Sequence, residues 1–133
     1  MTTIADVVAR LYSAMTDGTN QILTLTLMTD WNTGPFWVAV NDGVADPYDV
    51  EDIVEVVPLS AELLDAIAAW DQRFQATLNE EYPPDSGFPT PEEDLAFINQ
   101  GRELARRLKA EAPAEVVVRY APPHNAEPQE IIP

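Results

Sequence analysis

The sequence contains no cysteine, one histidine and only seven lysine or arginine residues among its 133 residues. The lack of cysteine excludes a disulfide framework, a thiol nucleophile and thiolate metal ligands, and it fits a reducing cytoplasm. Long hydrophobic runs are also missing, because the N-terminal apolar stretch contains Asp6 and has no basic leader. We therefore predict neither a signal peptide nor a membrane span, and we expect a cytoplasmic location.

Catalytic motifs are equally scarce. The single histidine, His124, lies in a proline-rich C-terminal segment where the sequence supports no base-orienting arrangement. The nucleophile-elbow, P-loop and dinucleotide-binding fingerprints do not occur. Carboxylate pairs such as Glu80–Glu81 have little weight in a chain with 23 acidic residues, because composition alone produces them. We predict a non-enzymatic protein without a cofactor; a small carboxylate-dependent hydrolase or lyase is the weakest alternative.

What the sequence has in excess is negative charge, with a formal net charge of −16. Residues 1–72 hold twelve acids and one base, whereas residues 73–133 hold eleven acids and six bases, so the two halves carry −11 and −5. Such a field repels nucleic acid and anionic membranes and attracts cationic proteins. We therefore expect a cationic protein partner and no direct contact with nucleic acid or a membrane.

Hydrophobic periodicity predicts a single α+β domain over residues 1–120. Apolar residues at helical spacing from Ile4 to Met15 predict an N-terminal helix that ends at Gly18. Residues 21–28 and 36–41 alternate between apolar and polar side chains, which predicts two strands. The short Gly-Pro loop between them favours an antiparallel hairpin.

The remaining strands are expected on either side of two helices. Residues 53–57, IVEVV, indicate a third strand or strand edge, which Pro58 ends. Residues 115–120, EVVVRY, predict the last strand. The strands together predict a small, mostly antiparallel sheet that packs against the N-terminal helix and a two-helix hairpin. Residues 121–133 are rich in proline and lack periodicity, which predicts a flexible tail.

The two helices of the hairpin have clear start signals. Ser60 is a predicted N-cap, and the apolar positions that follow it at helical spacing are Leu63, Ile67, Trp70, Phe74 and Leu78. Thr90-Pro91-Glu92-Glu93 predicts the start of a second helix that runs to about Ala110. Gly101 lies on the apolar stripe of this helix, which predicts close approach of a neighbouring helix.

Four of the seven basic residues follow in this second helix. Arg102, Arg106 and Lys109 share one face, and Arg107 lies beside them as a possible partner of Glu103. Cations near a helix C-terminus complement the helix dipole, so we interpret this face as structural. A basic patch for a phosphate-bearing ligand is the alternative.

The turn between the helices, YPPDSGFPT, contains Phe88, which we expect to fold back as an anchor between them. Loops held by rigid elements also carry function, so a binding role for this turn remains a second interpretation.

The acidic segment NDGVADPYDVEDIVE is the candidate site. Its carboxylates are hard oxygen ligands, but their spacing does not match a calcium-binding EF-hand loop, so we predict no metal. A solvated loop and a protein-binding surface are the two remaining interpretations. Aromatic residues, including neighbouring Trp31, offer anchors beside the charge. The predicted partner-binding residues are Trp37, Asp42, Asp46, Tyr48, Asp49, Glu51, Asp52 and Glu55.

Residues 58–120 carry a resemblance to a known group of proteins. Their pattern is a helix with a tryptophan, an Ala-Thr-Leu-Asn segment, an Asp-Ser-Gly-Phe-Pro turn and a Gly-Arg-x-Leu-Ala helix. This pattern resembles small, mostly uncharacterised actinobacterial proteins, some of which are similar to immunity proteins encoded beside polymorphic toxins. The resemblance implies an acidic binder that caps a toxin's active site, with residues 58–120 as the scaffold and the first half as the partner-facing surface.

These observations favour an immunity or antitoxin-type inhibitor that occludes the basic active site of a partner toxin. Attraction between opposite charges accelerates association, which suits an inhibitor that must act before damage occurs. The alternative is a structural or assembly protein, such as a phage or oligomer subunit, in which the acidity serves solubility only.

Overall fold

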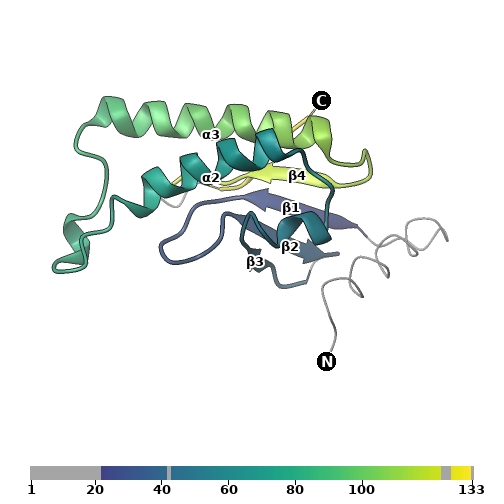
Figure 1. Ribbon diagram of the computed structural model, residues 1–133, viewed down its shortest axis with the longest axis horizontal. Helices are drawn as coiled ribbons and strands as arrows, with labels where there is room; N and C mark the ends of the chain where they lie inside the picture. The colour runs from purple at the N-terminus through teal and green to yellow at the C-terminus, as the bar shows by residue number, and fades with distance from the viewer. Residues whose placement is uncertain (1–21, 42, 124–126, 133) are drawn as a thin grey trace.

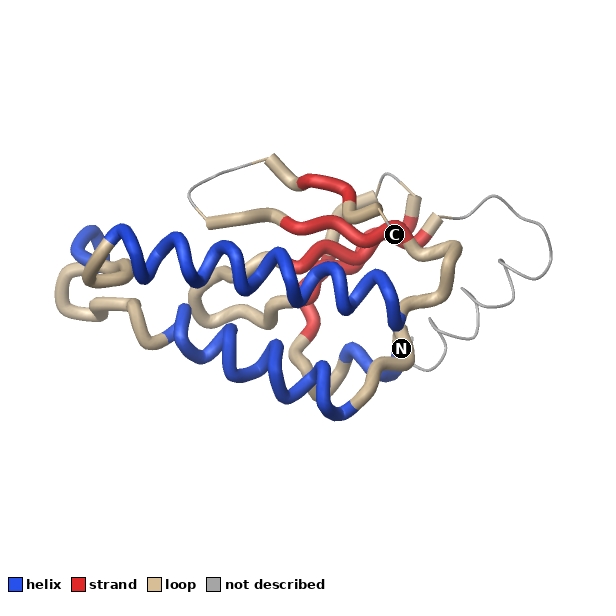
Figure 2. Tube along the Cα trace, turned by 90° about the horizontal axis from the view of Figure 1, so that it is seen from above, coloured by secondary structure: helices blue, strands red, loops and turns tan. Residues whose placement is uncertain are grey.

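Two helices lie side by side on one face of a five-stranded sheet (Figures 1 and 2). The computed structural model describes residues 22–41, 43–123 and 127–132, so the N-terminal helix that we predict lies outside the described residues. The strands are β1 (Leu23–Leu27), β2 (Phe36–Val40), β3 (Asp46–Tyr48), β4 (Val117–Tyr120) and β5 (Gln129–Glu130). The helices are η1 (Ile53–Glu55), α2 (Ala61–Gln75), η2 (Pro83–Asp85) and α3 (Pro91–Glu111).

The sheet has the order β3-β2-β1-β4-β5, with β1 at its centre. The pairs β1–β2, β2–β3 and β4–β5 are antiparallel, whereas β1 and β4 are parallel. A parallel pair needs a long crossover connection, and the segment that contains α2 and α3 supplies it. The predicted α+β class with a mostly antiparallel sheet is confirmed.

The β1–β2 hairpin follows directly from the alternation in its sequence. Leu23, Leu25 and Leu27 of β1 are buried beneath the helices, while Thr24 and Thr26 on the opposite face are partly exposed. The register pairs Leu23 with Val40 and Leu27 with Phe36. Opposed residues of neighbouring strands share a face, so the apolar face of β1 continues into β2.

The predicted strand at 53–57 is wrong. Ile53–Glu55 forms the 3-10 helix η1, and the backbone N–H groups of Val56 and Val57 both donate to the Ile53 carbonyl at 2.9 Å. Ile53, Val56 and Val57 are buried, and a spacing of three and four places them on one side of a helical turn. The third strand is instead Asp46–Tyr48, an edge strand in which Pro47 pairs with Trp37 of β2.

Both predicted helix starts are confirmed. The Ser60 and Thr90 hydroxyls accept the backbone N–H groups of Leu63 and Glu93, each at 3.1 Å. These hydrogen bonds satisfy donors that the first turn of a helix leaves without a backbone partner. The helix α2 ends at Gln75, so Leu78 lies beyond it.

The core between the helices and the sheet is built around Trp70 of α2. Trp70 is fully buried, its ring stacks on Phe97 of α3 at 4.7 Å, and its Nε1 donates to the Phe97 carbonyl at 3.0 Å. Phe88, from the turn between the helices, packs against Phe97, and the centroids of the two rings are 4.8 Å apart. This contact agrees with the predicted role of Phe88 as an anchor. Gly101 makes the close approach possible, because a Cβ there would lie 2.5 Å from the Trp70 ring and 2.8 Å from Cζ of Tyr120.

The segment after β4 is partly ordered by the sheet. Gln129 and Glu130 form β5 beside β4, and the backbone N–H of Ile131 donates to the Val118 carbonyl at 2.8 Å. The boundary between a domain at 1–120 and a flexible tail at 121–133 stays a prediction, but residues 129–131 are held by the sheet.

No helix within the described ranges combines the length and the apolar character that crossing a membrane requires.

Candidate functional site

The acidic segment forms one edge of the sheet and the turn that follows it. Asp46 and Tyr48 belong to β3, while Asp49 begins a turn in which its carbonyl accepts the N–H groups of Asp52 and Ile53 at 3.1 and 3.0 Å. This turn leads into η1 and leaves the side chains of its acidic residues exposed. Asp42 lies outside the described residues.

Some of these carboxylates lie near other titratable side chains and influence the pKa of those side chains. Burial raises the pKa of Tyr48, and the nearby charges of Asp46 and Asp52 raise it further. Burial also raises the pKa of Asp71 in α2; a hydrogen bond from Gln75 opposes this rise, and the charge of Asp49 adds to it. We call this group the acidic surface, and its members are Asp46, Asp49, Glu51, Asp52, Glu55 and Asp71.

Asp71 is the member that sequence reasoning missed. It comes from a helix more than twenty positions further along the chain than Asp49, and only the folded structure brings the two carboxyl groups together. One local signal was available, because an acid next to the buried Trp70 must lie on a flank of the helix rather than on its outer face.

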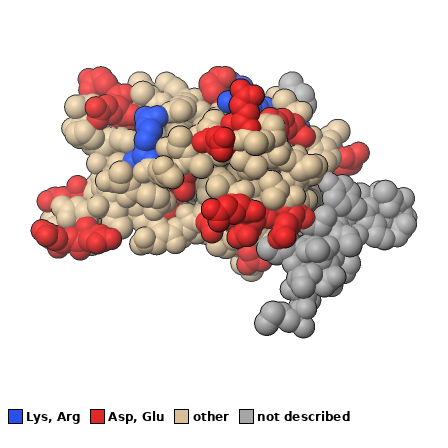
Figure 3. Space-filling view, viewed as in Figure 1, with Lys and Arg blue, Asp and Glu red and all other residues tan. Residues whose placement is uncertain are grey.

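Exposed apolar side chains accompany the acidic surface. Val54 of η1 is 42% exposed and Val44, just before β3, is 88% exposed. The space-filling view shows acidic side chains on several parts of the visible surface, with basic side chains over the helices (Figure 3). Apolar anchors within a charged rim are a common arrangement of protein–protein interfaces.

Trp37 lies apart from these residues. Phe36 and Val38 on either side of it are buried beneath the helices, and strand side chains alternate, so Trp37 belongs to the opposite face of the sheet. Asp46 pairs with Val38 and Tyr48 pairs with Phe36, which places both on the helix side. The Nε1 of Trp37 donates to the Met28 carbonyl at 3.1 Å.

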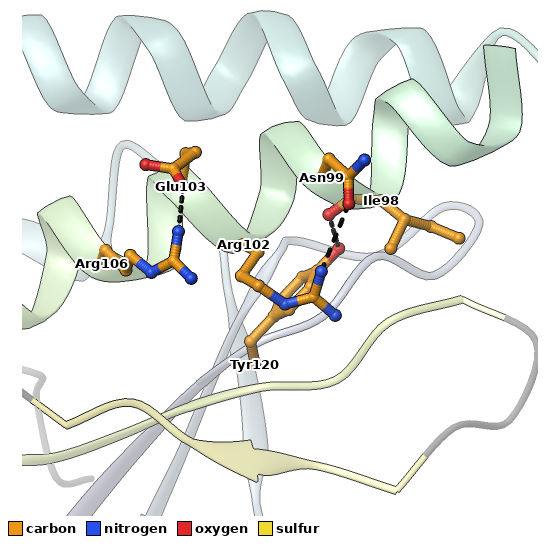
Figure 4. A network of polar contacts seen from close by, with 6 residues as sticks. All are labelled: Ile98, Asn99, Arg102, Glu103, Arg106 and Tyr120. Carbon is orange, nitrogen blue, oxygen red and sulfur yellow. Dashed lines mark hydrogen bonds and ion pairs between the residues drawn. The ribbon is translucent and has the colours of Figure 1, made fainter. Parts of the chain in front are cut away.

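Three of the four basic residues of α3 have partners within the described part of the fold, and Figure 4 shows those of Arg102 and Arg106. Arg102 lies over the Tyr120 ring at 5.8 Å and donates to Asn99, while Tyr120 donates to the Ile98 carbonyl at 2.9 Å. Lys109 donates to the Val116 carbonyl at 2.9 Å. Arg106 pairs with Glu103, so Glu103 does not form the pair with Arg107 that the sequence suggested. These contacts support the structural interpretation of the basic face.

A pocket opens at the end of the molecule where the β1–β2 loop faces the connection between α2 and α3. Its volume is about 830 Å³, and it is shaped by the aromatic rings of Trp31, Phe74 and Phe88. Trp31 and Phe74 stack at 5.3 Å. We call this the end pocket; its other walls include Thr29, Asp30, Asp94 and four prolines, Pro89, Pro91, Pro122 and Pro123.

Two residues that line the end pocket each have a buried side-chain polar atom without a hydrogen-bond partner within the described part of the chain. These atoms are the Thr29 hydroxyl oxygen and Nε1 of Trp31. Thr29 is only 8% exposed. A buried polar group without a partner costs about 1–3 kcal/mol of stability, so such groups are rare in folded proteins.

The β1–β2 loop connects the end pocket to the acidic surface. Gln75 of α2 holds the loop, because its amide donates to the Asp30 carbonyl and accepts the N–H of Asn32, both at 2.8 Å. The same amide donates to Asp71 at 3.3 Å. Gly34 at the base of the loop packs against the end of β3, where a Cβ would lie 2.7 Å from the Asp49 nitrogen.

Metal-ligating geometry is absent from the part of the chain that the structure describes, since no group of three or more acidic or histidine side chains there could hold an ion.

The fold and this surface together define a small α+β domain with an acidic edge and an aromatic end pocket. A scan against family models then identifies the family: the chain belongs to the Serratia CdiI immunity protein-like family, whose model matches residues 23–123. The match extends from β1 through β4 and therefore includes the hairpin and the acidic segment. No curated protein matches the chain.

Family membership supports the predicted resemblance to immunity proteins of toxin systems and implies a toxin as the partner. Immunity protein families are in general non-enzymatic. The actinobacterial part of the resemblance stays a prediction.

Proposed function

We propose that this protein neutralises a contact-dependent inhibition toxin by placing its acidic surface over a basic active-site region of that toxin. The observation that carries the proposal is that Asp46, Asp49, Glu51 and Asp52 are all exposed along the edge strand β3 and the turn after it, close in the chain to the exposed Val54. The family match favours this function over an assembly protein.

The mechanism is occlusion assisted by charge. A net charge of −16 attracts a cationic surface over a distance of about 10 Å at 0.1 M salt, which raises the association rate. After the encounter, Val54 and the half-buried Tyr48 supply apolar contact area within the acidic rim. The toxin's substrate is then excluded without any chemistry by the inhibitor.

Binding kinetics of charge-neutralised variants test the proposal. The first variant carries Asp46→Asn, Glu51→Gln and Asp52→Asn, and it is measured against the toxin that co-purifies from the native host at two ionic strengths. We expect association that is about tenfold slower or more at low salt, and a flatter dependence on salt.

A matched control removes the same number of charges elsewhere. Glu115, Glu127 and Glu130 are exposed and lie outside the acidic surface, so changing all three to Gln should slow association much less. Circular dichroism confirms that both variants fold. Equal association rates for the two variants would contradict the proposal, because they would show that only total charge matters.

A further inference from the structure

The end pocket has the features of a built binding site rather than of a packing defect. The described residues that line it supply aromatic rings, two carboxylates and two buried polar atoms without a partner among the described residues, and they include no lysine or arginine. Among the described lining residues, the only charges that an anionic ligand would meet are the like charges of Asp30 and Asp94. The chemistry of the walls therefore selects a ligand with a cationic group and a flat or apolar body.

We propose that the end pocket receives an arginine side chain of the partner toxin, together with the neighbouring peptide backbone. A guanidinium group is planar and stacks on aromatic faces, and Trp31 presents a half-buried ring that Phe74 supports from one side. The N–H donors of arginine match the Asp30 carboxylate, one oxygen of which already accepts the Trp31 backbone N–H at 2.8 Å, and the Thr29 hydroxyl, which can accept.

The unpartnered N–H group of the Trp31 indole is the reason for including peptide backbone in the proposed ligand. Nε1 of Trp31 can only donate, so a cation cannot satisfy it, whereas a peptide carbonyl can. A volume of about 830 Å³ also leaves room beyond a single side chain. A protruding basic loop of a protein supplies both groups at once.

The position of the pocket fits the same partner. The β1–β2 loop forms one wall of the pocket and, through Gly34 and Gln75, also contacts β3 and Asp71. A toxin seated on the acidic surface can therefore reach the pocket along this loop. The inference rests on the proposed function, because it assigns the arginine to the toxin.

A peptide titration tests the pocket without the toxin. The probe is N-acetyl-Gly-Arg-Gly-amide, and the readout is the indole N–H resonance of Trp31, identified by its loss in Trp31→Phe. We expect this resonance to shift on titration. The matched peptide with citrulline, which keeps the shape of arginine and removes its charge, should bind at least about tenfold more weakly.

Variants distinguish binding in the end pocket from a general attraction of the peptide to acidic side chains. Asp30→Asn and Thr29→Val should each weaken binding of the arginine peptide, whereas Glu115→Gln, which removes one exposed charge outside both the pocket and the acidic surface, should not. Equal binding of the arginine and citrulline peptides, or no shift of the Trp31 resonance, would overturn the inference.

The toxin itself completes the test. We expect the double variant Thr29→Val/Asp30→Asn to bind the co-purifying toxin at least about tenfold more weakly than the wild type. If the wild type binds and the double variant binds equally well, this inference is wrong and the proposed function stands. If the wild type binds no toxin, the proposed function itself is wrong.

Discussion

Trp70 is the largest side chain that the fold buries completely, and it contacts both helices and the sheet through Phe97 and Tyr120. We expect Trp70→Ala to lower the free energy of unfolding by about 3–5 kcal/mol, because it opens a cavity and removes the ring that stacks on Phe97. Urea denaturation followed by circular dichroism measures this change. The conservative Trp70→Phe should cost less, since it retains an aromatic ring against Phe97 and loses the indole hydrogen bond and part of the buried volume; an equal cost would show that a phenyl ring cannot replace the indole in this core.

Gly101 offers a second test at the scale of one residue. Alanine is favoured over glycine within a helix by about 1 kcal/mol, yet a Cβ at this position would meet the Trp70 ring and the Tyr120 side chain. We therefore expect Gly101→Ala to destabilise the protein by about 1–3 kcal/mol, measured by the same denaturation. Combining it with Tyr120→Phe should recover part of the loss, because the phenol oxygen is one of the atoms in the way. A stabilised Gly101→Ala variant would contradict the tight packing.

Tyr120 makes stability sensitive to alkaline pH. Burial raises the pKa of this tyrosine to about 12, although the positive charge of Arg102 opposes the shift. A tyrosine in the unfolded chain ionises near pH 10, so this contribution is complete below about pH 10 and is lost as the pH rises toward 12. We expect the wild type to lose about 2–3 kcal/mol more stability than Tyr120→Phe over this interval. If the free energies of unfolding of the two proteins change equally from pH 9 to 12, ionisation of Tyr120 does not contribute to the pH dependence of stability.

At the scale of elements, the two antiparallel helices are joined at one end by a single carboxylate. Glu111 at the end of α3 accepts the Ser60 backbone N–H at 2.7 Å and the Ser60 hydroxyl at 2.8 Å, and Ser60 also caps α2. We expect Ser60→Ala to cost about 0.5–2 kcal/mol. A double-mutant cycle with Glu111→Ala should give a coupling energy of about 0.5 kcal/mol or more. If the destabilising effects of Ser60→Ala and Glu111→Ala simply add, Ser60 caps α2 independently of the Glu111 carboxylate.

The sequence predicts elements well where one face of a long segment is apolar. The alternation in 23–27 and 36–40 and the caps at Ser60 and Thr90 all appear in the structure as expected. The pattern of segment 53–57 predicts a strand because β-branched residues favour strands, but its backbone hydrogen bonds close locally after the Asp49 turn.

The true third strand carries almost no sequence signal. Asp46-Pro47-Tyr48 contains two residues that are depleted in strands, and proline removes a ladder hydrogen bond. An edge strand tolerates this loss, because one side of it has no neighbour. The end pocket was equally hidden, since Trp31 and Phe74 belong to different elements and only tertiary packing stacks them.

For the whole molecule, the charge that the sequence shows directly also predicts a property of the folded state. Sixteen excess negative charges repel one another more strongly in the compact chain than in the expanded one. Salt at physiological concentration reduces the Debye length to about 8 Å and screens this repulsion. We therefore expect the Tm to rise by a few degrees between low salt and physiological sodium chloride, with differential scanning calorimetry as the measurement. A Tm that falls with salt would show that attractive ion pairs dominate.

Composition and periodicity could not predict the order of the strands. Local patterns reveal the hairpin, but the placement of β4 beside β1 depends on how the connecting helices pack against the sheet. The same limit applies to Asp71, which joins the acidic surface only after α2 has docked.

The parallel pairing of β1 with β4 has a consequence for how the protein is made. Thr24 pairs with Val117, so the central strand of the sheet lacks one neighbour until residues near 120 have been synthesised. Chains are built at roughly 5–20 residues per second, and contacts between distant segments form late in folding. A ribosome that stops after α3 therefore releases a chain with an open sheet edge in its middle. Under the proposed function, we therefore expect a product that ends after α3 to lack the β1–β4 pair and to give the cell no protection.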